Sequence, residues 1–314
     1  MKLVTIGVPV YNGGRHLRQA LESIRSQTYP ALEILISDNA STDATRRICH
    51  EYAAADHRVR VHRNERNFGA AFNYNKVARL ARGEYFKWAA HDDVLAPTHI
   101  ESCVRLLDRE PAAVLCYPRP VIIDDEGTQV AHYDDRLHTD SSSPNLRLRR
   151  FLHKAPESNP IFGLIRASAL GSTRLIGSYD SSDYVLLAEL ALRGEIHELP
   201  QRLFFRRVRT GADRPRMSNR ERAAWFDTSA RGPNALPFVR VLIELCRSVT
   251  SAPLTAKQRA LCLGEIVRAA PALGARTLDW LRLRRHADSP LVRATGTVHI
   301  PSRRGLEASS VEAE

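Results

Sequence analysis

Long apolar runs are missing from the sequence. No segment reaches the roughly 18 uninterrupted apolar residues of a membrane-spanning helix. The opening stretch MKLVTIGVPVYN is strand-like and lacks the longer apolar core and small-residue cleavage site of a signal peptide. We therefore expect a soluble or peripheral protein in the cytoplasm, either free or on the cytoplasmic face of the inner membrane.

Cysteine is scarce and scattered, with five residues in a chain of 314. None forms a C-x-x-C pair, and no cluster of cysteine and histidine has the spacing of a zinc site. The pattern is typical of reduced thiols inside a core, as in the reducing cytosol. A structural zinc site is therefore not expected.

Glycine-rich phosphate-binding loops are also missing. The first strand-like run is not followed by G-x-G-x-x-G, and the chain contains no G-x-x-x-x-G-K-[ST]. If this protein binds phosphate groups, a metal ion and basic side chains must hold them.

Positive charge is in excess: the net charge is +11 and the sequence pI is about 9.8. Such a balance suits a polyanionic partner, although a solvated arginine-rich surface explains it equally well. No nucleic-acid-binding motif accompanies the basic residues and aromatics are sparse, so nucleic acid is not an expected partner. The basic helices near the carboxyl end either dock on an anionic membrane surface or pack on the rest of the protein.

The first 120 residues alternate strand-like apolar runs with segments of helical periodicity. The strand-like runs are LVTIGVPV, LEILISD, VRVHRN, EYFKWAA and AAVLCYP. Repeated β-α units predict an α/β fold with a mostly parallel, Rossmann-like central sheet flanked by helices. Later, EIHELPQRLFFRRVR predicts two short strands, and the chain is expected to be all-helical from about residue 218.

Three of the predicted strands end in polar residues: VPVYNGG, ISDNASTD and AAHDDV. Ligands of open α/β sheets bind beyond the carboxyl ends of the strands, so these three ends should share one rim. Tyr11 can stack on a base or a sugar, or simply pack in its turn. Asp38 can accept a hydrogen bond from a ligand N–H such as the imide of uracil, because a carboxylate at a strand end has no local cap to make. Asp43, in the first turn of the next helix, mainly complements the helix dipole.

Asp92 and Asp93 are adjacent carboxylates at the end of a strand, where their mutual repulsion needs a compensating cation. A hard divalent ion prefers oxygen ligands, and magnesium typically takes one or two protein carboxylates plus substrate phosphates. The pair therefore predicts a site for Mn²⁺ or Mg²⁺ that bridges to a diphosphate. The alternative is that both residues cap the helix that follows.

Three stretches resemble the inverting family 2 glycosyltransferases, which have the GT-A fold. The three stretches are IGVPVYNGGRHLRQALESIRSQTYPALEILISDNASTDAT, RNERNFGAAFNYNKVARLARGEYFKWAAHDDVLAP and SSDYVLLAELALRG. Together they cover about residues 3 to 210, and they match in identity, order and spacing. The resemblance implies a GT-A nucleotide-sugar-binding and catalytic domain over 1–215. A helical extension over 216–298 and a disordered tail over 299–314 are expected to follow.

Carried over by position, the resemblance implies roles for individual residues. Pro9, Tyr11 and Asn12 line the nucleotide pocket, and Asp38 recognises the base. Asp92 and Asp93 stand where the family's carboxylates bind Mn²⁺ or Mg²⁺ against the sugar diphosphate. Asp183 matches the aspartate of the family's E-D pair and would be the catalytic base, which deprotonates an acceptor hydroxyl for in-line attack with inversion.

The sequence departs from the family at several of these positions. The family often writes the strand-four motif as D-x-D-D, but Ala90 and His91 stand in its first two places. One nucleotide or metal contact is therefore missing, or His91 supplies a substitute donor contact. Ser182 replaces the glutamate of E-D. Further candidate donor contacts are Asn75 and an arginine of FFRRVRTG, namely Arg206, Arg207 or Arg209, with Arg207 preferred for the diphosphate.

The resemblance predicts transfer of a sugar from a UDP-, dTDP- or GDP-linked donor to a hydroxyl of a glycan, glycolipid or cell-envelope precursor. One alternative is a nucleotidyltransferase on a similar sheet, although YNGGRH is short and lacks the expected lysine. The other is a nucleotide-sugar-binding protein whose altered motif has lost catalysis.

Overall fold

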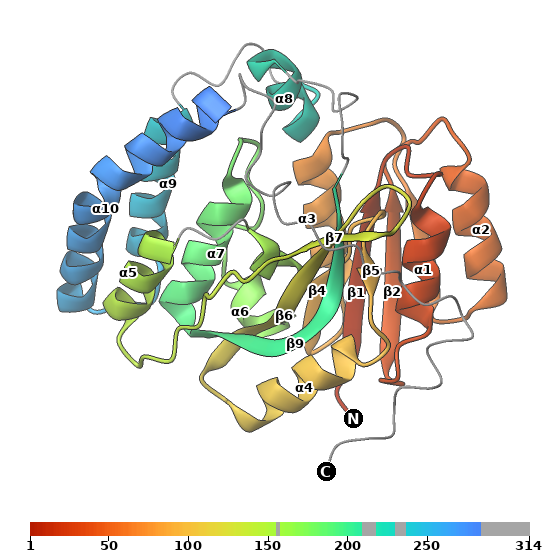
Figure 1. The fold of residues 1–314 in the computed structure, drawn as a ribbon, viewed down its shortest axis with the longest axis horizontal. Helices are drawn as coiled ribbons and strands as arrows, with labels where there is room; N and C mark the ends of the chain where they lie inside the picture. Colours follow the sequence, from red (N-terminus) through yellow and green to blue (C-terminus); the bar gives the residue numbers. More distant parts are fainter. Residues whose placement is uncertain (155–157, 209–217, 230–236, 284–314) are drawn as a thin grey trace.

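We analysed a computed structural model of the chain. It describes residues 1–154, 158–208, 218–229 and 237–283. A nine-stranded sheet with the order β3-β2-β1-β4-β8-β6-β9-β5 forms the centre, and β7 pairs with β6 beyond this path. Helices cover the sheet, with α1 and α2 at one end of the molecule and α9 and α10 at the other (Figure 1). The expected tail over 299–314 lies outside the described residues.

The strands of the first half run parallel. They are β1 (Val4–Val10), β2 (Leu32–Asp38), β3 (Val59–Arg63) and β4 (Tyr85–Trp88). The register sets Val10 opposite Asp38 and Gly7 opposite Trp88. Because β1, β2 and β4 run in the same direction, their carboxyl ends meet at one edge, as the sequence predicts.

The second half of the sheet mixes parallel and antiparallel pairs. Its strands are β5 (Val94–Leu95), β6 (Ala113–Ile123), β7 (Gln129–His132), β8 (Leu164–Arg166) and β9 (Glu195–Arg207). The prediction of two short strands in EIHELPQRLFFRRVR is wrong, because β9 is a single strand. It follows β6 in parallel across a register shift near Pro118, so one long strand absorbs Pro200 without ending.

Apolar stripes decide which helix faces are buried. In α1 (Leu17–Arg25), for example, Leu17, Leu21 and Ile24 face the sheet and are almost fully buried. The other helices before residue 200 are α2 (Thr45–Ala55), α3 (Ala70–Leu80), α4 (His99–Arg109), α5 (Pro144–Lys154), α6 (Ala167–Gly171) and α7 (Ser182–Arg193), with a 3₁₀ turn at Asn159–Phe162.

Three helices follow the sheet: α8 (Asn219–Phe226), α9 (Pro237–Ser251) and α10 (Ala256–Leu283). Leu245 and Val249 of α9 and Ile266 of α10 are buried in the same core cluster as Leu186 of α7. The two long helices therefore pack on α5 and α7 beside the sheet (Figure 1). No helix among the described residues is both long enough and apolar enough to cross a bilayer.

Candidate active site

The turn after β1 is tied to the turn after β2. Asn12, in a left-handed conformation with φ 51°, donates its backbone N–H to Ser41 Oγ at 2.9 Å. Its Oδ1 accepts from the backbone N–H of Thr42 at 2.9 Å. Pro9 is buried in β1, whereas the Tyr11 side chain is exposed at the edge and can stack on a ligand. The turns that follow β1 and β2 are thus held together by hydrogen bonds, and the surface that they form is called the shelf below.

Asp38 lies buried at the end of β2. Its Oδ1 accepts from the backbone N–H of Ser41 at 2.8 Å, and its Oδ2 pairs with Arg63 of β3. The expectation that Asp38 has no local partner is therefore wrong. Arg63 was missed because the register that sets it opposite Asp38 joins two strands distant in sequence. The Ser41 N–H and the Arg63 guanidinium already orient the Asp38 carboxylate. A ligand N–H would be a third donor to the same group.

Four asparagines fix the rim behind Asp38, and sequence reasoning missed them. Asn73 of α3 donates to Ser37 O at 2.8 Å and accepts from Ser37 Oγ at 2.6 Å. Asn39 donates to Asn67 Oδ1 at 2.7 Å and accepts from Asn64 at 2.8 Å. The signal for Asn64, Asn67 and Asn73 is the density of asparagine in RNERNFGAAFNYN, and Asn39 lies apart in ISDNASTD. Their amides satisfy backbone groups that the strand ends leave unpaired.

Asp92 and Asp93 lie between β4 and β5, at the same edge as the ends of β1 and β2. Asp93 is buried, and its Oδ1 accepts from the backbone N–H of Arg207 at 2.8 Å. Burial and then the charge of Asp92 raise the pKa of Asp93 to about 7. The two carboxylates therefore repel each other, which is the condition that a bound cation relieves.

His91 lies directly against the shelf. A Cβ added to Gly13 would come within 2.6 Å of His91 Cδ2, so the ends of β1 and β4 are in contact through this ring. The His91 ring, which the sequence suggests as a donor contact, therefore packs on Gly13.

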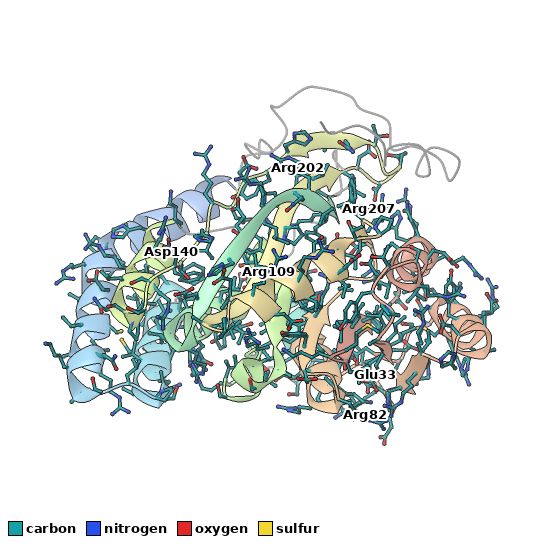
Figure 2. All side chains as sticks on the ribbon, turned by 90° about the horizontal axis from the view of Figure 1, so that it is seen from below. Glu33, Arg82, Arg109, Asp140, Arg202 and Arg207 are labelled. Carbon is teal, nitrogen blue, oxygen red and sulfur yellow. The ribbon has the colours of Figure 1, made fainter. Side chains whose placement is uncertain are left out.

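Arg207 does not have the free guanidinium expected of a diphosphate ligand. Its Nε donates to the carbonyl of Asp92 at 2.9 Å, and its Nη1 donates to the carbonyls of Asp124 at 2.5 Å and Asp125 at 2.9 Å. Its Nη2 donates to Gln19 Oε1 at 2.6 Å. Arg207, which the sequence suggests as a phosphate ligand, joins β9, the β6–β7 turn, α1 and the Asp92 backbone. Its role toward phosphate stays a prediction. Arg207 lies near the end of β9 (Figure 2). Arg206 bonds Asn159 Oδ1 at 2.7 Å, and Arg209 lies outside the described residues.

Lys87 of β4 is fully buried behind the carboxylate pair. Its ammonium donates to the carbonyl of Phe162 and lies 5.3 Å from the ring centroid of Phe204. Burial lowers its pKa to about 8, and its charge acts on Asp93. The sequence shows this lysine within an apolar run, but it gives no sign of the buried cation's proximity to Asp93.

Asp183 lies in the first turn of α7, where its Oδ1 accepts the backbone N–H of Tyr184 at 2.8 Å. Burial raises the pKa of Asp183. Burial, and then the charges of Asp92, Asp93 and Asp183, raise the pKa of Tyr74 in α3. The three carboxylates predicted from the sequence therefore all act electrostatically on one tyrosine.

Asn75 has a different partner from the one expected. Its amide nitrogen donates to Ile176 O at 2.8 Å, and its oxygen accepts from Ile176 N at 3.0 Å. Both polar ends are used by the segment that leads to Asp183. Asn75 thus ties α3 to that segment, and its role as a donor contact stays a prediction.

The carboxylate pair fits a metal that the substrate helps to hold. Among the described residues, no group of three or more His, Cys, Asp or Glu side chains is placed to bind an ion without help. Magnesium sites commonly use one or two carboxylates and take their other ligands from phosphate and water. Asp92 and Asp93 supply that number of hard oxygen ligands at a rim open to a ligand.

Residues 5–178, more than half of the chain, match the profile of the family described as Glycosyl transferase family 2. The chain therefore belongs to this family. It is 35% identical over 114 residues to the glycosyltransferase GlyG of Streptococcus pneumoniae serotype 4. That match covers 36% of this chain and 38% of GlyG, so it spans well under half of the relative's length.

Solved structures share the GT-A fold. Residues 1–349 of S. aureus TarS, in complex with UDP-GlcNAc, align with a TM-score of 0.62 at 18% identity, over 85% of this chain and 72% of that one. A mannosyltransferase from Pyrobaculum calidifontis, in complex with GDP-Man and Mn²⁺, aligns with a TM-score of 0.52 at 16% identity. That alignment covers 92% of this chain and 82% of the mannosyltransferase. At these identities the likeness concerns the fold.

Proposed function

We propose that this protein is an inverting glycosyltransferase that transfers a sugar from a nucleotide-diphospho-sugar to an acceptor hydroxyl. The observation that carries the proposal is the placement of Asp92 and Asp93 after β4, at the same edge of the sheet as Asp38 at the end of β2. The charges of this pair and of Asp183 all act on the buried Tyr74. Family membership and the nucleotide-sugar complexes of the structural neighbours support it.

The donor would lie along the shelf in a fixed direction. Its base would stack on Tyr11, beside Pro9 and Asn12, and offer an N–H to Asp38, which Arg63 holds in place. Its diphosphate would then reach Asp92 and Asp93, next to His91. A Mn²⁺ or Mg²⁺ ion held by these two carboxylates would offset the charge of the leaving diphosphate.

Asp183 would accept the proton of the acceptor hydroxyl. A general base works best when its pKa lies near the working pH, and burial raises the pKa of Asp183 in that direction. Attack from the Asp183 side, opposite the diphosphate, would invert the anomeric carbon. The expected acceptor is a glycan, a glycolipid or another cell-envelope precursor, met in the cytoplasm or at the cytoplasmic face of an anionic membrane.

Asp183→Asn tests this assignment. We expect kcat to fall by about a thousandfold, as for loss of a general base, with donor affinity unchanged. Asp140→Asn is the control, because its exposed carboxylate pairs only with Arg150 among the described contacts. Full turnover in Asp183→Asn would contradict the proposed base. Donor binding without turnover in the wild type, across glycan and lipid acceptors, would favour a binding protein. Release of diphosphate from an NTP and a sugar 1-phosphate would favour a nucleotidyltransferase.

A further inference from the structure

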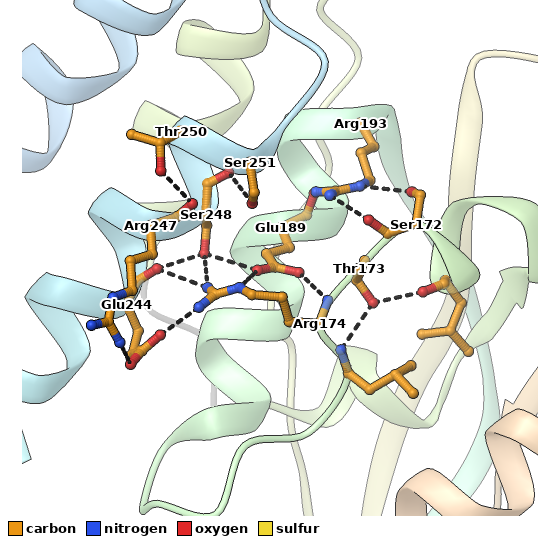
Figure 3. Close-up of polar contacts among 12 residues, drawn as sticks. Ser172, Thr173, Arg174, Glu189, Arg193, Glu244, Arg247, Ser248, Thr250 and Ser251 are labelled. Atoms are coloured by element: carbon orange, nitrogen blue, oxygen red, sulfur yellow. Dashed lines mark hydrogen bonds and ion pairs between the residues drawn. The ribbon is translucent and has the colours of Figure 1, made fainter.

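The segment before α7, residues 172–181, is here called the base loop because it leads directly to Asp183. Its first anchor is Arg174, which binds Glu189 of α7 twice: its backbone N–H donates to Oε2 at 2.9 Å and its Nε donates to Oε1 at 2.6 Å (Figure 3). Glu189 is almost fully buried, so this pairing is shielded from water. The base loop is thus fastened to the helix that it precedes.

The second anchor comes from the carboxy-terminal helix α9. Arg174 also pairs with the Glu244 carboxylate, and its Nη2 donates to Glu244 O at 2.9 Å and to Ser248 Oγ at 2.7 Å (Figure 3). Glu244 is buried as well. One guanidinium therefore joins two buried carboxylates, one on α7 and one on α9.

A second arginine of α9 reaches the other half of the base loop. Arg240 pairs with Glu244 at 3.0 Å, and its guanidinium lies 5.1 Å from the ring centroid of Tyr179. Cation–π contacts of this kind favour one position of the ring. Glu244 thus acts on the base loop through Arg174 near its start and through Arg240 near its end.

Helix α8 supplies the third anchor. Arg222 pairs with Asp180 at 3.1 Å, and both side chains are mostly buried. At the other end of α8, the Phe226 carbonyl lies against Gly69, and Thr228 Oγ1 donates to Asn67 O at 2.9 Å. Helix α8 therefore connects the asparagine-rich rim behind Asp38 with the base loop.

We propose that α8 and α9 position the catalytic base. Arg174, Glu244 and Arg222 act as positioning residues that hold the base loop, and through it Asp183, at a fixed distance from the donor site. The base loop ends at Ser181, whose φ of 66° makes a tight left-handed turn two residues before Asp183. A displacement of the loop is therefore passed to the Asp183 backbone. This inference rests on the proposed role of Asp183.

The chain offers a matched control for a stabilising role. Glu265 of α10 is also buried, and it pairs with Arg268 at 2.5 Å and with Arg149 of α5 at 3.9 Å. It resembles Glu244 in burial and in arginine partners, but none of its partners belongs to the base loop. Glu265→Gln should destabilise the helical layer without moving Asp183.

The experiment compares Glu244→Gln, Glu244→Asp and Arg222→Met with Glu265→Gln in the full chain, by steady-state kinetics and thermal unfolding. We expect Glu244→Gln and Arg222→Met to lower kcat about tenfold, the order expected from a small misplacement of a reacting group. The KM for the donor should change less than about twofold, and Glu244→Asp should recover part of kcat. Glu265→Gln should keep kcat within about twofold while its Tm falls as far as that of Glu244→Gln.

The inference is overturned if Glu244→Gln keeps wild-type kcat, or if Glu265→Gln loses as much kcat as Glu244→Gln does. The Asp183→Asn variant, measured alongside, separates this result from the proposed function. If Asp183→Asn is inactive while Glu244→Gln is fully active, the positioning inference alone fails. If Asp183→Asn is fully active, the proposed base fails, and a loss in Glu244→Gln then has another cause.

Discussion

The backbone N–H of Arg207 donates to Oδ1 of Asp93 at 2.8 Å, so the last residue of β9 holds the carboxylate that follows β4. The same residue holds the carbonyl of Asp92 through its guanidinium. One arginine thus holds the Asp93 carboxylate and the Asp92 backbone, from 114 and 115 residues away in sequence. The geometry of the proposed metal site depends on this clasp.

Arg207→Met should remove the side-chain part of the clasp, because methionine keeps the backbone N–H that Asp93 accepts but has no guanidinium. Several backbone carbonyls and Gln19 would lose their donor, and we expect the free energy of unfolding to fall by about 3 kcal/mol, with turnover lost as well. Arg202→Met is the control on the same strand, because Arg202 bonds Pro120 O, Tyr133 O and Asp134 instead. We expect Arg202→Met to have a lower Tm than the wild type. Its Tm should nevertheless rise when donor and Mn²⁺ are added. An Arg207→Met protein that responds to donor and Mn²⁺ as the wild type does would refute the clasp.

Lys87 should make stability depend on pH in the alkaline range. Its pKa is lowered to about 8 in the folded state, from 10.5. Between these values the unfolded chain holds more protons at this site, so stability rises with pH and is lost again as pH falls towards 8. We expect the wild type to gain up to about 3 kcal/mol relative to Lys87→Met between pH 7 and pH 10.5. Chemical unfolding at several pH values measures this, and parallel profiles would show that the ammonium is not buried as described.

Gly69→Ala should loosen α8. Gly69 has φ 91°, and an added Cβ would lie 2.4 Å from the Phe226 carbonyl oxygen, so both the backbone and the contact oppose a side chain. We expect amide exchange in residues 219–226 to accelerate about tenfold. Gly171→Ala is the control, because its added Cβ meets nothing within 4 Å. Equal protection of α8 in both variants would contradict the docking of α8 on Gly69.

The sequence predicts the parallel half of the sheet and its polar rim well. The strands there are apolar runs of four to seven residues between periodic helices, and the carboxyl ends of parallel strands must share an edge. Asp38, Asp92 and Asp93 follow from that rule. By contrast, β5 has two residues and β8 has three, too few for an alternation of side chains to mark them.

The partners of the rim residues could not be predicted. Arg207 and Gln19 are 188 residues apart, and Arg174 and Glu244 are 70 apart. Nothing local distinguishes a clasping arginine from a surface one, because both are charged residues in polar surroundings. The sequence therefore suggested Arg207 as a phosphate ligand, and tertiary packing gave it carbonyl partners instead.

The most direct test of the account is a thermal-unfolding panel of UDP-, GDP- and dTDP-sugars, each with and without Mn²⁺. One donor class should raise the Tm of the wild type by several degrees with Mn²⁺, because a ligand at 100 times its Kd adds about 2.7 kcal/mol. The increment due to Mn²⁺ should vanish in the Asp92→Asn/Asp93→Asn variant. No response to any of the three donor classes would contradict the central claim that this rim binds a nucleotide-diphospho-sugar.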